Sequence, residues 1–224
     1  MRIILLAATL ALSSAANAAV ILVQTNDPGF YNNSLGTVLN DTNGGNTSTG
    51  YFPTSNDATV SFPVAPDLSA AASILGNWLS DPLHLNSNWS ATQIAIPNQW
   101  TVGTEVAVIY QFDTLSATNV VARFGVDNGM FVWLDGNYIF GARAAGSFSL
   151  GEYTLNLGDL SAGTHFLQLL LEDHGSTNGY AVEISADTFV PGPPPVPEPA
   201  TSLLLGAGLL GLAARAARGL RSPR

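Results

Sequence analysis

The 224-residue chain contains no cysteine, which excludes disulfides, a thiol nucleophile and zinc sites built on thiolates. It also contains no lysine, and between residues 20 and 190 the only arginines are Arg123 and Arg143. The same stretch carries 15 acidic residues, so its formal charge is 2 − 15 = −13. This charge repels nucleic acid and anionic lipid, and we expect neither as a partner of the region.

Sequence signatures of catalysis are also missing. The chain has no G-x-S-x-G sequence and no H-E-x-x-H spacing. His165 follows a turn in an expected strand, where a structural role is the usual one. Four glutamates could supply the carboxylate pair of a glycosidase, but an acidic domain contains that many by chance: Glu105, Glu152, Glu172 and Glu183. We therefore expect a protein that is not an enzyme.

The N-terminus has the pattern of a secretory signal peptide over residues 1–19. Arg2 precedes an apolar stretch at residues 3–12, and Ala16-Asn17-Ala18 provides an A-x-A cleavage site. The Sec export machinery is the expected partner of such a segment.

The C-terminus has the pattern of a membrane-sorting tail over residues 196–224. A Pro-rich linker at residues 191–197 holds five prolines and favours a stiff polyproline II spacer. The tail then contains the sorting triplet Pro197-Glu198-Pro199, an apolar run at 203–214, and a basic cluster that would stop transfer across the membrane: Arg215, Arg218, Arg221 and Arg224. The run predicts a short transmembrane helix with its basic end in the cytoplasm.

Together with the signal peptide, this tail resembles the PEP-CTERM exosortase substrates of Gram-negative bacteria. An L-P-x-T-G motif, which a Gram-positive wall-sorting tail needs, does not occur. The resemblance implies that the inner membrane holds the tail until exosortase, a membrane-embedded enzyme, removes it. It also implies a final location at the cell surface or in the extracellular matrix, associated with exopolysaccharide or biofilm.

Residues 20–190 are predicted to form one all-β domain, a β-sandwich of the jelly-roll type with one short helix. Residues 26–60 are rich in turn formers and predict long loops with short edge strands. Residues 67–79 place leucines and alanines on one helical face behind Asp67, a candidate cap. After Asn88, strands separated by Gly, Asp and Asn turns are expected at 91–96, 104–112, 119–126, 130–134, 138–140, 152–157, 164–172 and 180–186.

Two stretches in this domain are more specific. Residues 123–138 contain Asp127-Asn128-Gly129 and Trp133-Leu134-Asp135-Gly136, and residues 160–175 begin Leu160-Ser161-Ala162-Gly163-Thr164-His165. Their order resembles PA14-like and galactose-binding-like β-sandwiches. Many domains of this kind bind sugars, whereas others are purely structural.

The PA14-like resemblance implies a calcium site at Asp127 and Asn128, where sugar-binding adhesins of that kind carry two aspartates. Asparagine keeps an oxygen ligand but removes one charge, which weakens calcium binding. Asn137 and Asp173 can add oxygens if their loops converge on this pair. The alternative is that Asp127-Asn128-Gly129 is simply a turn, and no cofactor is then expected.

Tryptophans offer another route to sugars, because pyranose rings stack on indoles. Trp133 alternates with apolar residues and is expected in the core, whereas Trp89 and Trp100 stand beside polar residues and are expected nearer the surface. Three functions thus remain: a non-catalytic surface or matrix protein, which we favour, a carbohydrate-binding module, and a secreted glycan hydrolase.

Overall fold

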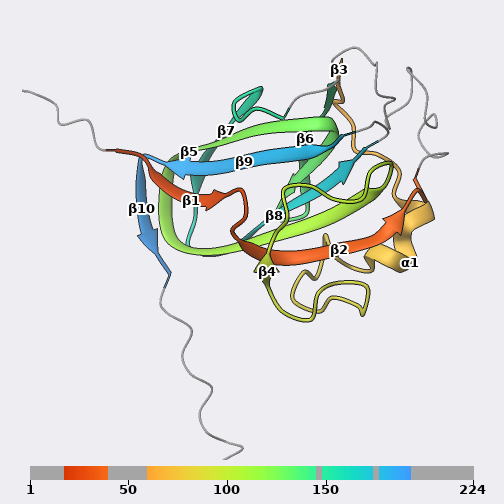
Figure 1. The fold of residues 1–224 in the computed structure, drawn as a ribbon. Coiled ribbons are helices and arrows are strands. Elements are labelled where there is room, and N and C mark those ends of the chain that lie inside the picture. Colours follow the sequence, from red (N-terminus) through yellow and green to blue (C-terminus); the bar gives the residue numbers. More distant parts are fainter. Residues whose placement is uncertain (1–17, 40–59, 145–147, 174–176, 193–224) are drawn as a thin grey trace, which may run out of the picture. The chain divides into compact units, whose positions relative to one another are not determined.

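The computed structural model describes residues 18–39, 60–144, 148–173 and 177–192. The predicted sorting tail, and all of the signal peptide except residues 18 and 19, lie outside these ranges. The described residues confirm an all-β fold with one short helix (Figure 1). None of their helices has the length and apolar character that crossing a bilayer requires. The strands are β1 (Val20–Gln24), β2 (Pro28–Gly36), β3 (Val60–Ser61), β4 (Ile94–Ala95), β5 (Glu105–Leu134), β6 (Asn137–Ala144), β7 (Tyr153–Leu160), β8 (Gly163–Glu172), β9 (Gly179–Ala186) and β10 (Thr188–Pro191).

Strand β5 organises the domain. It is 30 residues long and joins three strands that were predicted separately. Its residues 105–114 pair with one edge of β8 and its residues 129–134 with the other, both antiparallel. Residues 117–127 between them pair instead with β7 and β9. Figure 1 shows β5, in green, curving round between these two sets of partners.

The pairing divides the strands into two layers. Layer A has the order β4, β2, residues 105–114 of β5, β8, residues 129–134 of β5, β6 and β3. Layer B has the order β1, β9, residues 117–127 of β5, and β7. Strand β10 pairs with the bend of β5 between the layers. The predicted turn at 127–129 therefore lies inside β5, where the strand passes from β9 to β6 and β8.

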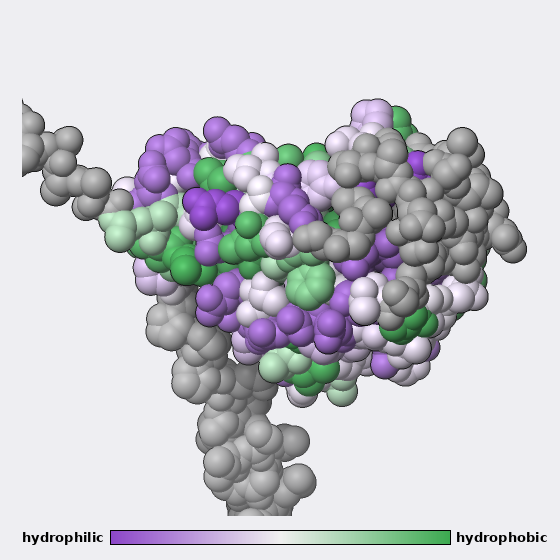
Figure 2. Space-filling view, turned by 45° about the horizontal axis from the view of Figure 1, so that its top comes forward, coloured by the Kyte–Doolittle hydropathy of each residue, from purple (hydrophilic) through white to green (hydrophobic). Residues whose placement is uncertain are grey.

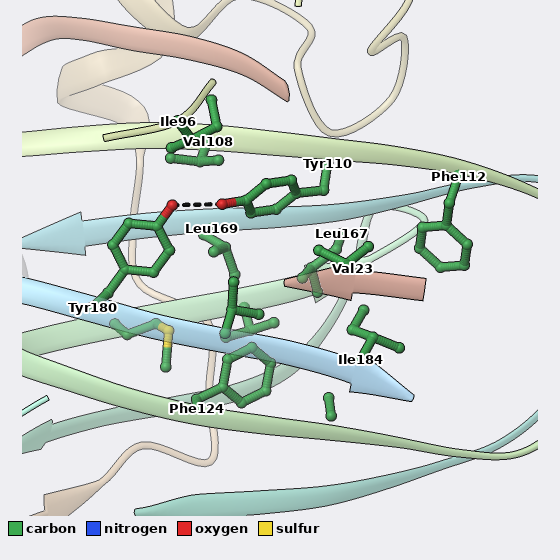
Figure 3. Packing of buried hydrophobic residues seen from close by; sticks show 14 of the residues in the cluster. Val23, Ile96, Val108, Tyr110, Phe112, Phe124, Leu167, Leu169, Tyr180 and Ile184 are labelled. Atoms are coloured by element: carbon green, nitrogen blue, oxygen red, sulfur yellow. Dashed lines mark hydrogen bonds between the residues drawn. The ribbon is translucent and has the colours of Figure 1, made fainter. Parts of the chain in front are cut away.

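The main core lies between the layers. Layer A contributes alternate residues of β5 and β8, such as Val108 and Leu169, and layer B contributes Phe124 and Ile184 (Figure 3). The two buried tyrosines of this core, Tyr110 and Tyr180, share a hydrogen bond between their hydroxyls at 2.5 Å. Each polar group thereby finds a partner within an apolar environment.

A second core covers the other face of layer A. The intervening residues of the same strands, among them Ile109, Phe131 and Leu170, pack against the segment before β5. That segment contains a 3-10 turn at Ser69–Ala71 and the helix α1 (Ala72–Leu75), and it brings Trp78 and Trp89 onto the sheet.

Two local predictions were wrong. The helix expected over 67–79 is reduced to one 3-10 turn followed by one α-helical turn. The α-helical turn ends at Gly76, whose backbone φ is +62°. Asp67 does accept a hydrogen bond from the Ser69 amide, as a cap would. Residues 26–60 were expected to form long loops with short edge strands, but they contain the nine-residue strand β2, which lies inside layer A between β4 and β5, since pairing with β5 overrides its polar composition.

Candidate functional site

Polar residues are buried at the end of the sandwich where β8 finishes and β9 starts. We call this region the acidic end. The register places Glu105 and Gly129 opposite Glu172 on either side of it, and Asp127 opposite Gly179. Each polar member is at most 4% exposed: Glu105, Asp127, Asn128, Arg143, Glu172, Asp173 and Asn178.

Asp173 and Asn178 fix the loop that precedes β5. Asp173 Oδ2 accepts a hydrogen bond from the Gly103 amide at 2.7 Å. Asn178 exchanges two bonds with the backbone of Trp100, accepting from its amide and donating to its carbonyl, each at 3.1 Å. The half-buried Trp100 indole donates to the Thr104 carbonyl at 2.8 Å. These two side chains therefore hold Trp100 beside the acidic end.

Glu105 and Glu172 are directly opposed residues of adjacent strands, and both are fully buried. Burial raises the pKa of Glu105 to about 8, although the nearby amides of Val38 and Leu39 act to lower it. The Glu172 carboxylate occupies the space above Gly129, where an added Cβ would collide with it. Gly129 lies between Glu172 on β8 and its other register partner, Arg143 on β6. Because Gly129 has no side chain, the Glu172 carboxylate has room to extend toward Arg143.

Asp127 and Asn128 lie where β5 passes between the layers. The peptide bond that joins them is cis. Carboxylate and amide oxygens are ligands that calcium accepts. Among the described residues, however, no group of three or more His, Cys, Asp or Glu side chains is arranged to hold a metal ion.

The predicted site residues divide into two groups. Asp127, Asn128 and Asp173 belong to the acidic end, and Trp100 lies next to it. Asn137 does not: it pairs with Leu134 at the opposite end of β6, seven residues or roughly 23 Å from Ala144, the partner of Asn128.

The expectation that Trp89 is near the surface was wrong. Its side chain is 5% exposed and belongs to the second core, where it stacks on Trp78. The indole donates to the Leu75 carbonyl at 3.1 Å. The ring is therefore held in the second core, and it also lines the hollow between Phe30 and the 83–91 loop.

The two specific sequence stretches meet again at the other end of β8, in a structural clamp. His165 places Nδ1 2.8 Å from Asp135 Oδ2 and Nε2 2.9 Å from the Ser161 carbonyl. Asp135 also accepts from the Phe166 amide at 2.8 Å. Burial alone would lower the pKa of His165, but the bonds to Ser161 and Asp135 outweigh it and raise the pKa above 6.5. Both ring nitrogens face acceptors, an arrangement that favours the imidazolium and tethers the β5–β6 hairpin to β8.

Two hollows in the described part of the chain lie beside the second core, and Glu105 and Glu172 line neither of them. One, of about 250 Å³, adjoins α1 and Trp78. The other, of about 370 Å³, lies between Phe30 and the 83–91 loop. The polar side chains of the acidic end are themselves buried.

Comparison with known proteins decides the identity of the tail. Residues 195–218 match the PEP-CTERM protein-sorting motif. The chain carries a PEP-CTERM sorting tail. This confirms the predicted resemblance, and the PEP-CTERM tail marks the protein for export and for exosortase-mediated sorting to a surface or extracellular location. The triplet Pro197-Glu198-Pro199 falls inside the matched residues.

Solved PA14 domains are among the structural neighbours of this PEP-CTERM protein. The PA14 domain of the MpAFP antifreeze protein is 17% identical, with 75% of this chain and 88% of that chain covered and a TM-score of 0.31. The PA14 sugar-binding domain of an RTX adhesin is 11% identical, with coverages of 74% and 94% and a TM-score of 0.31. A GH31 α-xylosidase from Xanthomonas citri is 9% identical, with coverages of 75% and 18% and a TM-score of 0.27. No curated protein matches the sequence.

Proposed function

We propose that this PEP-CTERM protein is a non-catalytic component of the cell surface or extracellular matrix, and that it associates with exopolysaccharide or biofilm. The observation that carries the proposal is the sorting motif at residues 195–218, which follows a single acidic β domain. A protein exported in this way reaches the place where the cell assembles its matrix.

The described carboxylates support a non-catalytic role. Glu105 and Glu172 have no exposed surface through which a substrate could reach them. Asp173 and Asp135 hold backbone amides, and Asp135 also holds His165. Because these groups are engaged in maintaining the fold, they are not arranged as an acid–base pair at a cleft.

The strand directions separate the acidic end from Gly192, the last residue that the structure describes. Strand β9 starts at the acidic end with Gly179 and runs to Ala186, which pairs with Val20 of β1. Strand β10 then leads to Gly192. Eight residues of extended chain span roughly 26 Å, so the acidic end and the C-terminal exit of the domain lie at opposite ends of β9.

Cell fractionation tests the proposal in the producing bacterium. We expect the protein in the surface or matrix fraction of wild-type cells, and its retention at the inner membrane when exosortase is deleted. The matched test uses a strain that lacks exopolysaccharide, in which the sorted protein should appear in the medium. Equal retention on cells with and without exopolysaccharide would contradict the association.

A carbohydrate-binding module is the second candidate, because the fold brings together three of the residues predicted to hold calcium and a sugar. Asp127, Asn128 and Asp173 lie at the acidic end, and Asn178 fixes Trp100 beside them. In this candidate, calcium at the aspartates coordinates glycan hydroxyls and the indole contacts a ring face.

Binding of the exported protein to purified exopolysaccharide and to a glycan array, with calcium and with chelator, tests the second candidate. We expect chelation or Asp127→Ala to abolish binding. Asn137→Ala is the matched control, since this exposed residue lies at the other end of β6 and should leave binding unchanged. Absence of binding in both buffers would exclude the module and leave the matrix role standing.

A further inference from the structure

Glu105 is a fully buried carboxyl group of the acidic end, and among the described residues no donor meets hydrogen-bond geometry at either of its oxygens, although the Val38 and Leu39 amides lie near it. A buried carboxylate without a partner is costly, and the carboxyl group avoids the cost by keeping its proton. Glu172, directly opposite on β8, adds a second acidic group in the same environment.

A short segment of the chain covers Glu105. Gly36 is its register partner on β2, and the amides of Val38 and Leu39 lie close enough to influence its carboxyl group. Leu35 and Leu39 anchor this segment, residues 35–39, by packing into the second core on layer A. Opening the segment would therefore expose Glu105 to water.

The charged groups around Glu105 favour a proton over a metal ion. Residues 35–39 contain no ionisable side chain. The groups that they bring near Glu105 are backbone N–H donors, which do not bind a cation. On β8 the register partner of Glu105 is Glu172, whose carboxylate extends over Gly129 on the other side of β8, and Asp173 follows it. Arg143 on β6 is separated from Glu105 by β8 and by residues 129–134 of β5.

We propose that Glu105 is a proton-controlled latch, which holds residues 35–39 closed over layer A in acid and loosens them as the pH rises. The inference is independent of sugar binding. The sign follows from linkage: the closed state binds the Glu105 proton more tightly than the open state, so closure is fully stabilised at low pH and weakens as the proton is lost.

The pH range is set by the two pKa values of Glu105. The open state titrates near the usual value of 4.5 and the closed state near about 8. The opening equilibrium should therefore rise up to roughly tenfold per pH unit between these values and level off above them.

Hydrogen exchange of the exported protein, corrected for intrinsic rates, measures the opening directly in peptides covering residues 30–39. In wild type we expect protection to fall from pH 5.5 to pH 7.5. In Glu105→Gln, which mimics the protonated group, protection should not change with pH. Glu183→Gln on the outward face of β9 is the matched control and should behave as wild type. An unchanged pH dependence in Glu105→Gln would overturn the latch.

Carboxyl 13C chemical shifts of the wild-type protein test the same inference without a variant. The Glu105 carboxyl group should titrate with a midpoint near 8. Titration of every glutamate below about pH 6 would overturn the proposal, since an exposed carboxyl group titrates near 4.3.

Discussion

Layers A and B differ in how many of their faces are buried. In layer A, residues 129–134 of β5 turn Met130 and Val132 to the main core and Phe131 and Trp133 to the second core. In layer B, the inward residues are equally apolar, but the outward face carries polar side chains. Figure 2, which brings the side of β7 and β9 forward, shows hydrophilic residues interspersed with hydrophobic ones. The outward residues include Arg123, Thr154, Asn156 and Glu183.

The comparison shows that a single strand can combine a continuous apolar pattern with an alternating one. Strand β5 is almost continuously apolar where both faces are covered, and it alternates where one face meets solvent. A sheet buried on both faces needs apolar residues at every position, whereas a sheet with one wet face needs them at every second position. The number of covering elements, rather than the strand itself, sets the pattern.

The largest expected effect is on the doubly buried layer. Leu170→Ala removes a fully buried side chain of the second core and should lower the free energy of unfolding by about 2–5 kcal/mol. Val121→Ala on the outward face of layer B is the comparison and should cost less than about 1 kcal/mol. Urea unfolding measures both, and equal losses would mean that the second core adds little to stability.

A smaller effect is expected at the clamp of layer A. Asp135→Ala leaves His165 and the Phe166 amide without their carboxylate acceptor and should cost about 1–3 kcal/mol. Asp159→Ala in layer B removes an exposed bond to the Asn119 amide, so its cost should stay below about 1 kcal/mol. Thermal unfolding compares the two, and a larger loss for Asp159→Ala would reverse the ranking of the layers.

The clamp also predicts a dependence on pH. Because the pKa of His165 is raised in the folded protein, its contribution is complete below about pH 6.5, the pKa of an unperturbed histidine, and is lost as the pH rises through the raised value. Stability measured against pH in the Glu105→Gln background isolates this effect. His165→Asn should flatten the remaining decline above pH 6.5, and a decline of unchanged slope would show that another group titrates there.

The smallest effect is expected at the ion pair on the outward face of layer B. Arg123 and Glu183 approach to 3.3 Å, but their side chains are 49% and 19% exposed. A double-mutant cycle of Arg123→Ala and Glu183→Gln should give a coupling of about 0.2–1 kcal/mol, reduced by salt. A coupling above about 2 kcal/mol that does not change with salt would mean that this pair stabilises the fold as much as the buried contacts of layer A do.

Strand positions could be predicted largely from local sequence. The runs predicted at 164–172 and 180–186 lie inside β8 and β9, because apolar and β-branched residues recur there between turn formers. Strand β2 could not be predicted in this way, since its Asn and Ser residues form a strand only through pairing with β5. The end of the predicted helix at Gly76 depends on one backbone angle that the leucine and alanine pattern does not reveal.

The candidate site was predicted in part. Asp127, Asn128 and Asp173 were selected from their loops, and the register brings them to one end. The burial of Glu105 was missed, because a glutamate at the start of a strand usually faces water. An available signal was the apolar run that follows it, Val106–Tyr110, which is typical of a strand buried on both faces.

By itself, the sequence determined the sorting tail, the acidic charge and the all-β class, since each depends on composition or on residues close together in the chain. Only the tertiary structure decided which carboxyl groups meet, which tryptophan stays near the surface, and that Asn137 lies away from the acidic end. These outcomes depend on strand register between residues as distant as Glu105 and Glu172. Register also determines burial, and burial determines whether a carboxyl group keeps its proton.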